Sequence, residues 1–431
     1  MRAHDQRSEA KDGANKISGG ERSAKMMIHK MATTRKPLRV LVTDDGYKST
    51  LGIVRCLGKK GISVSVMADS PVALASYSRY CSGKFLVPPA GDEAFLPAVK
   101  DIVRRGHFDL LMPVGYTAHV ALTRHKAELA PYTRMETADF EKIRRAADKR
   151  AMHELAKEVG VPTPRTLAPA SYKEAVQDST ELRFPVVIKA PRETLCDVVR
   201  YARDRRELLT LYGRICESAD GEGPLPLIQE FIPGFGCGFF ALYQDGVCKQ
   251  TFMHRRIREV PPSGGVSCCA ESYYNERLLD YGKRLLDRLE WHGVAMVEFR
   301  YDERDRDYKL LEVNPKFWGS LDLALEAGVE FPYYLCQMAR GQQLEYSEDY
   351  NRHLRYHWLL TDVQHVLMGP SSFGAFVADL LRPSVKSNIS WSDFKPNLLE
   401  PLTRMTSVIR RLWRKNHRAY KGFPGFRTSK P

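Results

Sequence analysis

The sequence predicts an α/β domain with a parallel sheet in the N-terminal part of the chain, followed by an α+β region. Two observations support this fold class. Short apolar runs alternate with helical patterns from Leu38 to Tyr116, and two apolar strands flank one charged turn between Val294 and Pro315. A length of 431 residues, of which 43% are hydrophobic, is enough for two or three domains.

The N-terminal region opens with a β-α-β pattern. An apolar strand, Leu38–Thr43, precedes a helical stretch through Leu57, and a second strand, Ile62–Ala68, follows. The alternation continues with a strand, a helix and a strand at 84–87, 93–105 and 110–114. This order indicates a parallel sheet with ligand-binding loops at the carboxyl ends of its strands.

The first turn of this region argues against a dinucleotide-binding site. Residues 43–48 read Thr-Asp-Asp-Gly-Tyr-Lys, which lacks the G-x-G-x-x-G pattern. Asp44 and Asp45 would also repel a pyrophosphate. We therefore do not expect an NAD-dependent enzyme.

The formal net charge of +14 lies entirely in the two ends of the chain. Residues 1–36 carry nine Lys and Arg against four Asp and Glu, and residues 401–431 carry nine against none. The body between them is neutral, which argues against specific nucleic-acid binding. We expect residues 1–36, which are rich in Ser, Gly, Lys and Ala, to form a flexible tail.

The basic C-terminal segment also carries bulky apolar residues at helical spacing between 404 and 421. They are Met405, Val408, Ile409, Leu412 and Trp413. Such a helix fits either a contact with a membrane surface or packing on the protein body, and we favour a weak surface or partner contact.

The cysteines and the hydropathy pattern favour a cytoplasmic protein. The nine cysteines are odd in number and include no C-x-x-C pair, so neither a disulfide framework nor a zinc site is indicated. No apolar run approaches the length that spans a bilayer, and the N-terminus lacks the apolar core of a signal peptide.

The second region begins with a helix at Asp148-Lys149, which the Gly-Val-Pro-Thr-Pro run at 160–164 ends. An apolar strand over 184–190 then carries Lys189 near its end, where a solvated charge is the simplest interpretation. Another strand, 227–232, leads to a hairpin around Asp245-Gly246.

The most informative pattern is the pair of strands at 294–301 and 309–315. If their turn is centred near Asp305, Glu298 and Glu312 lie directly opposite each other, and Asn314 follows on the same face. Two facing carboxylates repel each other unless a positive charge lies between them. Carboxylate and amide oxygens suit Mg²⁺, which binds through one or two carboxylates together with nucleotide phosphates. The alternative, two surface glutamates neutralised by nearby bases, fits the apolar flanking residues poorly.

The order of these motifs from about residue 40 to 345 resembles the ATP-grasp superfamily, which includes biotin carboxylase, carbamoyl phosphate synthetase and the D-alanine ligases. The similarity is greatest to a bacterial branch described as predicted carboxylate-amine ligases. The motifs that carry it are Gln-Glu-Phe-Ile-Pro-Gly at 229–234, Met-His-Arg-Arg-Ile-Arg-Glu at 253–259, Ser-Gly-Gly at 263–265, and Glu-Val-Asn-Pro-Lys-Phe-Trp-Gly-Ser at 312–320.

The resemblance implies a site for ATP and Mg²⁺, with Mn²⁺ as an alternative metal. It implies ATP-phosphate contacts for Lys149 and Lys189, and an adenine-binding hinge made of Gln229, Glu230, Phe231 and Ile232. It implies metal ligation by Glu298, Glu312 and Asn314. It places Arg256 and Arg258 where they would hold a substrate carboxylate or acyl phosphate, and gives Lys316 a catalytic, charge-stabilising role.

The sequence departs from the family pattern at three places. The loop after Lys189, residues 191–197, lacks the glycines of a phosphate cover, for which Arg192 or Arg200 would compensate. Gly236 stands where relatives place an acid on the ribose hydroxyls, so no residue is assigned to the ribose. Lys316 replaces an arginine, which keeps the charge and loses the bidentate geometry.

The resemblance implies four segments. They are a basic tail (1–36), an N-terminal α/β pre-ATP-grasp domain (37–140), a two-subdomain ATP-grasp domain (141–345, with a lid at about 160–230) and a C-terminal extension (346–431). The lid and the core would hold the nucleotide between two sheets.

The expected reaction is phosphorylation of a small-molecule carboxylate to an acyl phosphate, followed by attack of an amine and release of ADP and phosphate. Specificity is expected in residues 44–48, 115–117 and 256–265. An ATP-grasp kinase and a non-catalytic ATP-binding protein are the alternatives. The sequence leaves a homodimer open.

Overall fold

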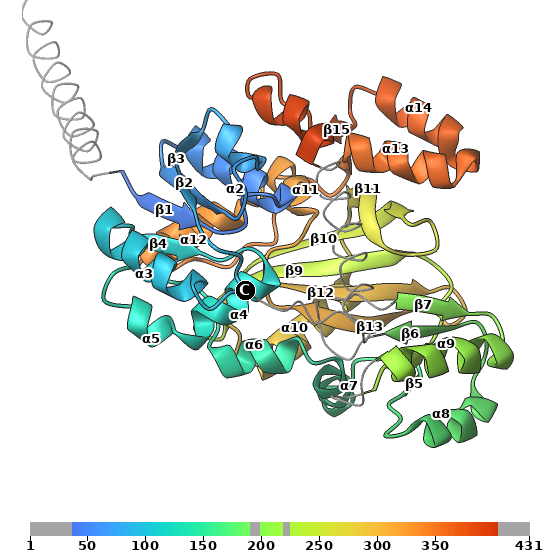
Figure 1. The fold of residues 1–431 in the computed structure, drawn as a ribbon. Helices are drawn as coiled ribbons and strands as arrows, with labels where there is room; N and C mark the ends of the chain where they lie inside the picture. Colours follow the sequence, from blue (N-terminus) through green and yellow to red (C-terminus); the bar gives the residue numbers. More distant parts are fainter. Residues whose placement is uncertain (1–36, 190–198, 219–224, 404–431) are drawn as a thin grey trace, which may run out of the picture. The chain divides into compact units, whose positions relative to one another are not determined.

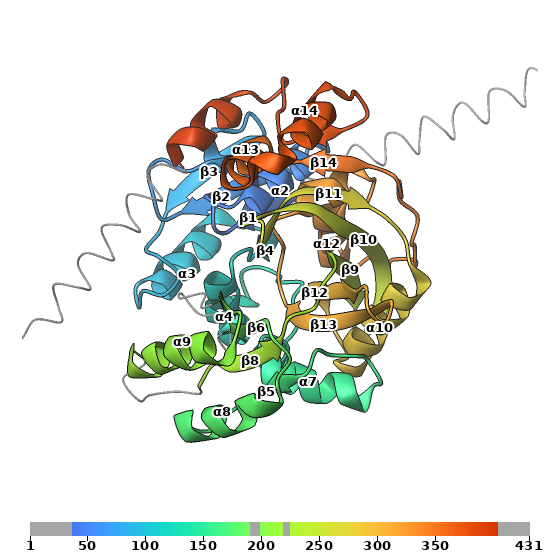
Figure 2. The same cartoon turned by 90° about the vertical axis from the view of Figure 1, so that its right-hand side faces the viewer.

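The computed structural model describes residues 37–189, 199–218 and 225–403. The described strands form three sheets, which Figures 1 and 2 show in two views. The N-terminal parallel sheet and the α+β region that follows it in the sequence confirm the predicted fold class.

The N-terminal sheet has the strand order β3-β2-β1-β4, and all its strands are parallel. Helices α3 and α4 cover one face, where Val99 and Leu122 pack against Leu41 of β1. Helix α2 packs against α11 and α12 of the later region. The elements are β1 (Arg39–Val42), α2 (Lys48–Lys59), β2 (Ser63–Ala68), η1 (Ala75–Tyr77), β3 (Cys81–Leu86), α3 (Phe95–Gly106), β4 (Leu110–Met112), α4 (Tyr116–Arg124), α5 (Lys126–Leu129) and α6 (Phe140–Ala146).

The central sheet has seven strands in the order β13-β12-β9-β10-β11-β14-β15. On one face, Phe239 and Val297 of the sheet pack in one core with Leu285 of α10 and Leu155 of α7. Strands β14 and β15 come from residues beyond 345, so the sheet continues into the C-terminal part of the chain. The elements are α7 (Lys149–Glu158), β9 (Gly236–Gln244), β10 (Val247–Val260), β11 (Val266–Ser272), α10 (Glu276–Arg288), β12 (Gly293–Asp302), β13 (Asp307–Asn314), α11 (Leu321–Glu326), α12 (Phe331–Ala339), β14 (Arg355–His357) and β15 (Lys386–Ser387).

The third sheet is antiparallel and has the order β5-β8-β6-β7. Helices α8 and α9 pack on it, and both views show them on its outer side (Figures 1 and 2). Tyr212 of α9 is fully buried there and donates its hydroxyl hydrogen to the carbonyl of Pro226 at 2.9 Å. The elements are β5 (Thr166–Leu167), α8 (Tyr172–Asp178), η2 (Ser179–Glu181), β6 (Val186–Lys189), β7 (Val199–Ala202), α9 (Arg205–Ser218) and β8 (Leu227–Glu230).

Local sequence explains where the elements around the site begin and turn. Asp148 caps α7, because its carboxylate accepts the N–H groups of Arg150 and Ala151 at 3.0 and 3.2 Å. The β9–β10 hairpin turns at Asp245-Gly246, where φ is 51° and 81°. Two successive positive φ angles suit a tight hairpin turn, as the Asp-Gly pair predicted.

The described C-terminal part adds α13 (Leu359–Met368), η3 (Pro370–Ser372) and α14 (Phe373–Leu381), and the chain is helical again over 395–403. Helix α13 packs against β10 and β11. Across the described ranges, no helix has both the length and the apolarity needed to cross a bilayer.

Candidate active site

A cavity of about 490 Å³ lies between the central sheet and the sheet of β5–β8. Lys189 and Tyr201 line it from the β5–β8 sheet, and strands β9, β10, β12 and β13 line it from the central sheet. Its described lining comprises Lys48, Ala147, Lys149, Lys189, Val199, Tyr201, Gly236, Arg256, Glu259, Gly264, Gly265, Val266, Ser267, Met296, Glu298, Arg300, Leu311, Glu312, Val313, Asn314, Lys316, Trp318, Gly319 and Ser320.

Glu298, Glu312 and Asn314 converge on one patch of this cavity. Glu298 of β12 is the direct partner of Glu312 of β13, and a bulge follows at once, because Phe299 pairs with Leu310. The Asn314 amide donates to Glu312 Oε1 at 3.1 Å. This bulge sets the register, because counting out from the turn pair Asp302–Asp307 alone would place Leu311 opposite Glu298. The period of two then puts Asn314 on the same face as Glu312, so the three side chains lie together as the sequence predicted.

Each of the two glutamates is paired with its own cation. Lys149 Nζ lies 2.9 Å from Glu312 Oε2, and Arg256 Nη2 lies 2.9 Å from Glu298 Oε2. Both glutamates keep part of their side chain exposed, 30% for Glu312 and 17% for Glu298. The pairs therefore line the cavity instead of filling the core beneath it.

The two carboxyl groups differ in proton affinity. Burial raises the pKa of Glu312, but Lys149, Lys189 and the Asn314 amide outweigh it and bring this pKa to about 2. Burial also raises the pKa of Glu298, and the neighbouring charge of Glu312 adds to the rise while Arg256 opposes it. This contrast is typical of two carboxylates that share one site.

The lining carries more positive than negative charge. Six Lys and Arg side chains face three glutamates, so the described wall has a net positive charge that suits a polyanionic ligand. The cations are Lys48, Lys149, Lys189, Arg256, Arg300 and Lys316, and the acids are Glu259, Glu298 and Glu312.

Lys189 reaches the cavity from the end of β6. Its ammonium donates to Gln229 Oε1 at 2.8 Å, and Gln229 in turn donates to Thr166 Oγ1 at 3.0 Å. Burial lowers the pKa of Lys189, and Glu312 and Glu298 oppose that effect. A solvated strand-end charge, the simplest interpretation of the sequence, is therefore wrong for this residue.

The predicted hinge lies behind the cavity wall. None of Gln229, Glu230, Phe231 and Ile232 is among the described lining residues. Arg300 connects the hinge to the cavity, because its side chain lines the cavity and donates to the carbonyls of Ile232 and Gly234, both at 2.6 Å. The N–H of Phe231 already bonds the carbonyl of Pro185 at 3.2 Å.

Arg256 and Arg258 were predicted to act together, and the structure separates them. Arg256 pairs with Ala270 and Arg258 with Cys269, so Ile257 is an extra residue that bulges β10. A bulge reverses the face to which the next side chains point. Arg258 is consequently buried outside the cavity lining, and its guanidinium bonds Asp362 and Asp379 at 2.7 to 2.8 Å. A direct role for Arg258 in substrate binding is therefore wrong.

Glu259 is a site residue that the sequence placed in the specificity range 256–265 without a role of its own. It lines the cavity and accepts from Arg256 Nη1 at 2.9 Å. A side chain at Gly236 would meet this pair, because a Cβ there would lie 3.0 Å from Arg256 Cδ and 3.3 Å from Glu259 Oε1. The carboxylate of Glu259 thus stands beside Gly236.

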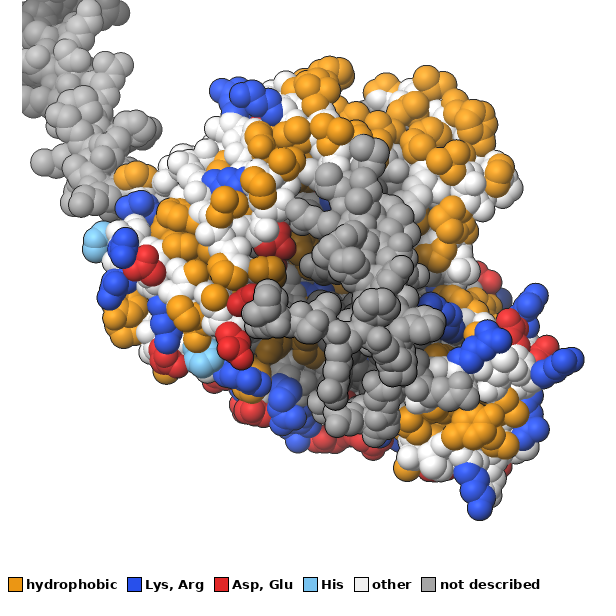
Figure 3. All heavy atoms as spheres, viewed as in Figure 1, with side chains coloured by type: hydrophobic (Ala, Val, Ile, Leu, Met, Phe, Trp, Pro, Cys, Tyr) orange, Lys and Arg blue, Asp and Glu red, His pale blue; other side chains and the backbone are white. Residues whose placement is uncertain are grey.

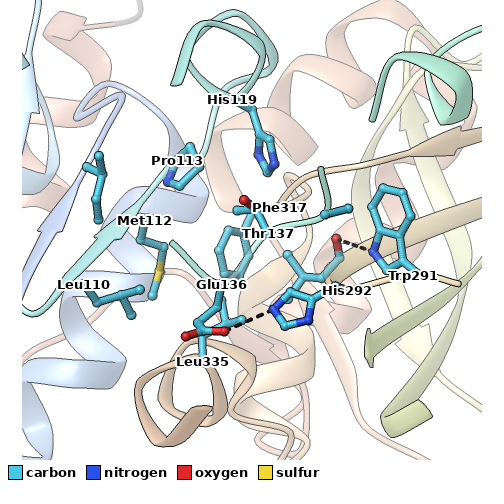
Figure 4. A pocket seen from close by; sticks show the side chains of 13 residues that line it. Leu110, Met112, Pro113, His119, Glu136, Thr137, Trp291, His292, Phe317 and Leu335 are labelled. Atoms are coloured by element: carbon cyan, nitrogen blue, oxygen red, sulfur yellow. Dashed lines mark hydrogen bonds and ion pairs between the residues drawn. The ribbon is translucent and has the colours of Figure 1, made fainter. Parts of the chain in front are cut away.

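Lys316 lies in the lining on the turn after β13. The next residue, Phe317, lines a second, much smaller cavity (Figure 4). That cavity has a volume of about 10 Å³, roughly the space of one water molecule, so it cannot hold a nucleotide. His119 of α4 lines it, and burial together with the charge of Lys316 lowers the pKa of His119 to about 3. His119 therefore stays neutral beside Lys316.

Figure 4 also shows His292 paired with Glu136, at 3.0 Å.

Some predicted features fall outside the described residues. These are Arg192 with the loop 191–197, and the two tails at 1–36 and 404–431. Arg200 is described on β7, where it is exposed and donates to the carbonyl of Val199 at 2.9 Å.

The donor set of Glu298, Glu312 and Asn314 fits a magnesium ion. All three offer oxygen atoms from one face of the hairpin, and Mg²⁺ completes its shell with water and phosphate oxygens. Over the described part of the chain, no cluster of three or more His, Cys, Asp or Glu could hold a metal. Two carboxylates and one amide are a set that depends on the nucleotide for its remaining ligands.

The fold is that of ATP-grasp proteins, as the order of the sequence motifs predicted. Residues 249–362 match the family described as ATP-grasp in the biosynthetic pathway with Ter operon.

Relatives and solved structures agree with that assignment. D-aspartate ligase of Enterococcus faecium is 24% identical over 269 residues, which are 57% of this chain and 63% of that protein. Biotin carboxylase of Campylobacter jejuni has a TM-score of 0.62 at 15% identity and 74% coverage of both chains. L-amino acid ligase of Bacillus licheniformis has a TM-score of 0.56 at 16% identity, covering 72% of this chain and 76% of that one. The chain spans less than two thirds of the length of D-aspartate ligase.

Proposed function

We propose that the protein is an ATP-dependent ligase that activates a small-molecule carboxylate and joins it to an amine. One observation carries the proposal: Glu298, Glu312 and Asn314 converge, among six cations, in a cavity between two sheets. Two proteins with the same fold were solved as complexes with an ATP analogue and with magnesium ADP. D-aspartate ligase and L-amino acid ligase are named for amino acids, which are both carboxylates and amines.

Different charged residues would bind the phosphates, the metal ion and the ribose of ATP. We assign Lys149 and Lys189 to the phosphate oxygens, because both ammonium groups lie beside Glu312 and reach the cavity from different elements. When bound at Glu298, Glu312 and Asn314, Mg²⁺ or Mn²⁺ would neutralise phosphate charge and favour phosphoryl transfer. We assign the ribose to Glu259, whose carboxylate stands beside Gly236.

We assign Arg256 and Lys316 to the reacting carboxylate. Arg256 lies next to Glu298, and Lys316 follows Asn314 by two residues, so both cations flank the triad. The substrate carboxylate attacks the terminal phosphorus of ATP, and ADP leaves. The neutral amine then attacks the carbonyl carbon of the acyl phosphate, the C–O bond to phosphate breaks, and phosphate carries away the electron pair while the nitrogen releases one proton to the phosphate or solvent. Positioning and charge stabilisation supply most of the rate enhancement in such transfers.

Product analysis tests the proposal. Purified protein is incubated with ATP, Mg²⁺ and one carboxylate together with one amine. The substrates are taken from a panel of L- and D-amino acids and other carboxylates. The expected products are ADP and phosphate in amounts equal to the ligated product. AMP and pyrophosphate as products would contradict the assignment.

Two alternatives are distinguished in the same assay. A kinase that stops at phosphorylation gives ADP and a stable phosphorylated product, whereas an acyl phosphate reacts with hydroxylamine to give a hydroxamate. A non-catalytic ATP-binding protein gives neither. The paired glutamates and their cations favour the ligase over the non-catalytic alternative, because binding ATP alone does not require two facing carboxylates.

A further inference from the structure

The described C-terminal stretch 359–403 has an unusual division of charge. Its four acids, Asp362, Asp379, Asp393 and Glu400, are all at most 6% exposed. Its Lys and Arg side chains, Arg382, Lys386 and Lys395, are all exposed. The outward surface of this stretch therefore carries positive charge and no negative charge.

Three of the four buried acids attach the stretch to the rest of the protein. Asp362 and Asp379 bind Arg258 of β10, and Asp379 also accepts from Arg355 at 3.0 Å. Asp393 binds Arg55 of α2 at 2.8 Å. Hydrogen bonds and ion pairs of this kind fix the orientation of the stretch, so its outer surface is a defined feature.

That outer surface is also strongly apolar. Leu367 and Leu381 are 78% and 75% exposed, and Trp391 is 84% exposed. Figure 3 shows hydrophobic side chains gathered over α13 and α14. We name as the C-terminal patch the exposed large apolar residues of this stretch: Val363, Leu367, Met368, Phe373, Leu380, Leu381, Trp391, Phe394, Leu398 and Leu402.

We propose that the C-terminal patch docks on the surface of an anionic lipid bilayer. Apolar side chains enter the boundary between headgroups and acyl chains, while Lys and Arg pair with lipid phosphates and carboxylates. The sequence that follows continues the charge pattern, because residues 404–431 carry nine Lys and Arg and no Asp or Glu. Stable membrane attachment takes two signals, and this part of the chain supplies both.

Charge complementarity favours a lipid surface over a second copy of this chain. A twofold dimer through the patch would bury the Arg382, Lys386 and Lys395 side chains of both copies in one interface, with no exposed acid of the stretch to pair them. Residues 404–421 would add further cations if they covered the patch. An anionic surface is the occupant that satisfies both the apolar and the basic residues.

Vesicle flotation with the full chain tests the proposal. The probes are vesicles of phosphatidylcholine alone and vesicles with about one quarter phosphatidylserine. The protein is expected to float with the anionic vesicles only, and added salt is expected to weaken binding steeply. Binding to both kinds of vesicle alike, or to neither, would overturn the proposal.

Paired variants separate the patch from the tail. Leu367→Ser with Leu381→Ser should weaken binding about tenfold or more, because two exposed leucines lose their burial in the interface. Leu86→Ser with Val247→Ser is the matched control, since these side chains are 63% and 56% exposed elsewhere. The control should bind as the unmodified chain does, and thermal melting checks that all variants fold.

Two further results would argue against the patch. If the patch variant bound fully, while Arg410, Arg411, Arg414 and Lys415 changed together to Gln abolished binding, the tail alone would be the membrane contact. If the patch variant converted a dimer into a monomer in analytical ultracentrifugation, the patch would be an interface between copies of this chain.

Discussion

Glu298 and Glu312 face each other across the β12–β13 hairpin, and each is held by a cation from a different element. Arg256 of β10 binds Glu298, and Lys149 at the start of α7 binds Glu312. The repulsion between the two carboxylates is therefore compensated without a metal. The same hairpin can present both glutamates to a magnesium nucleotide, because each keeps part of its side chain exposed.

Glu312→Gln should abolish turnover and leave the fold nearly unchanged. The variant loses a charged metal ligand, and we expect activity to fall about a hundredfold or more. The lost pair with Lys149 and the relieved repulsion from Glu298 act in opposite directions, so the free energy of unfolding should change by about 1 kcal/mol or less. Steady-state kinetics and urea denaturation measure the two effects. Glu303→Gln, at an exposed position of the same hairpin, is the control. Near-normal activity of Glu312→Gln would exclude the hairpin as the metal site.

Arg258→Gln should act on stability and leave catalysis intact. Removing this guanidinium leaves Asp362 and Asp379 buried beside each other without their main partner. Breaking a buried pair costs about 3 to 5 kcal/mol, so the melting temperature should fall strongly. The KM values and kcat of the remaining folded enzyme should stay unchanged.

Two variants check this interpretation of Arg258. Adding Asp362→Asn to Arg258→Gln should recover part of the lost stability, because it removes one unpaired charge. Arg256→Gln should instead lose turnover, since Arg256 lines the cavity. A large drop in kcat for folded Arg258→Gln would show that this residue does touch the reaction.

The sequence could predict that Glu298 and Glu312 lie near each other, because two apolar strands flank one short turn, but it did not indicate the bulge at Leu311 that sets their register. It could not separate Arg256 from Arg258, since the bulge at Ile257 has no signature in the residue types. Counting out from the Asp245-Gly246 turn would have paired Gly236 with Arg255. The register shift between Cys248 and Gln250 of β10, which the residue types do not indicate, instead brings Gly236 beside Arg256. The ion pair between Asp393 and Arg55 joins residues 338 positions apart, and no local sequence pattern indicates such a contact.

Gly236→Ala should lower the affinity for ATP. A methyl group there would lie 3.0 Å from Arg256 Cδ and 3.3 Å from Glu259 Oε1, so the Arg256–Glu259 pair must shift. We expect the KM for ATP to rise about tenfold, while the free energy of unfolding changes by about 1 kcal/mol. Gly374→Ala, where a Cβ meets nothing within 4 Å, is the control and should leave the KM unchanged. An unchanged KM in Gly236→Ala would remove Glu259 from the nucleotide site.

Asp393→Asn should destabilise the protein in a pH-dependent way. Asp393 is buried and accepts from Arg55 Nε, Ser78 Oγ and the Arg79 N–H at 2.7 to 2.8 Å. Burial raises the pKa of Asp393, but the bonds from Arg55, the Arg79 N–H and Ser78 outweigh it and hold this pKa below its ordinary value. A carboxyl group with a lowered pKa in the folded state contributes stability that is complete above its unfolded pKa of about 3.9. That contribution is lost as the pH falls through the lower, folded pKa.

The free energy of unfolding, measured in urea from pH 7 down to pH 3, provides the test of Asp393. The variant should be less stable than the unmodified chain by about 3 kcal/mol at neutral pH, because Arg55 loses its charged partner. The difference should stay constant down to about pH 5 and shrink below about pH 4, because Asp393 then takes up a proton in the unfolded chain while it remains ionised in the folded one. Asp349→Asn, at an exposed position, should show no such difference at any pH. A difference for Asp393→Asn that grew on acidification would mean that the folded pKa of Asp393 is raised, and the argument from its hydrogen bonds would fail.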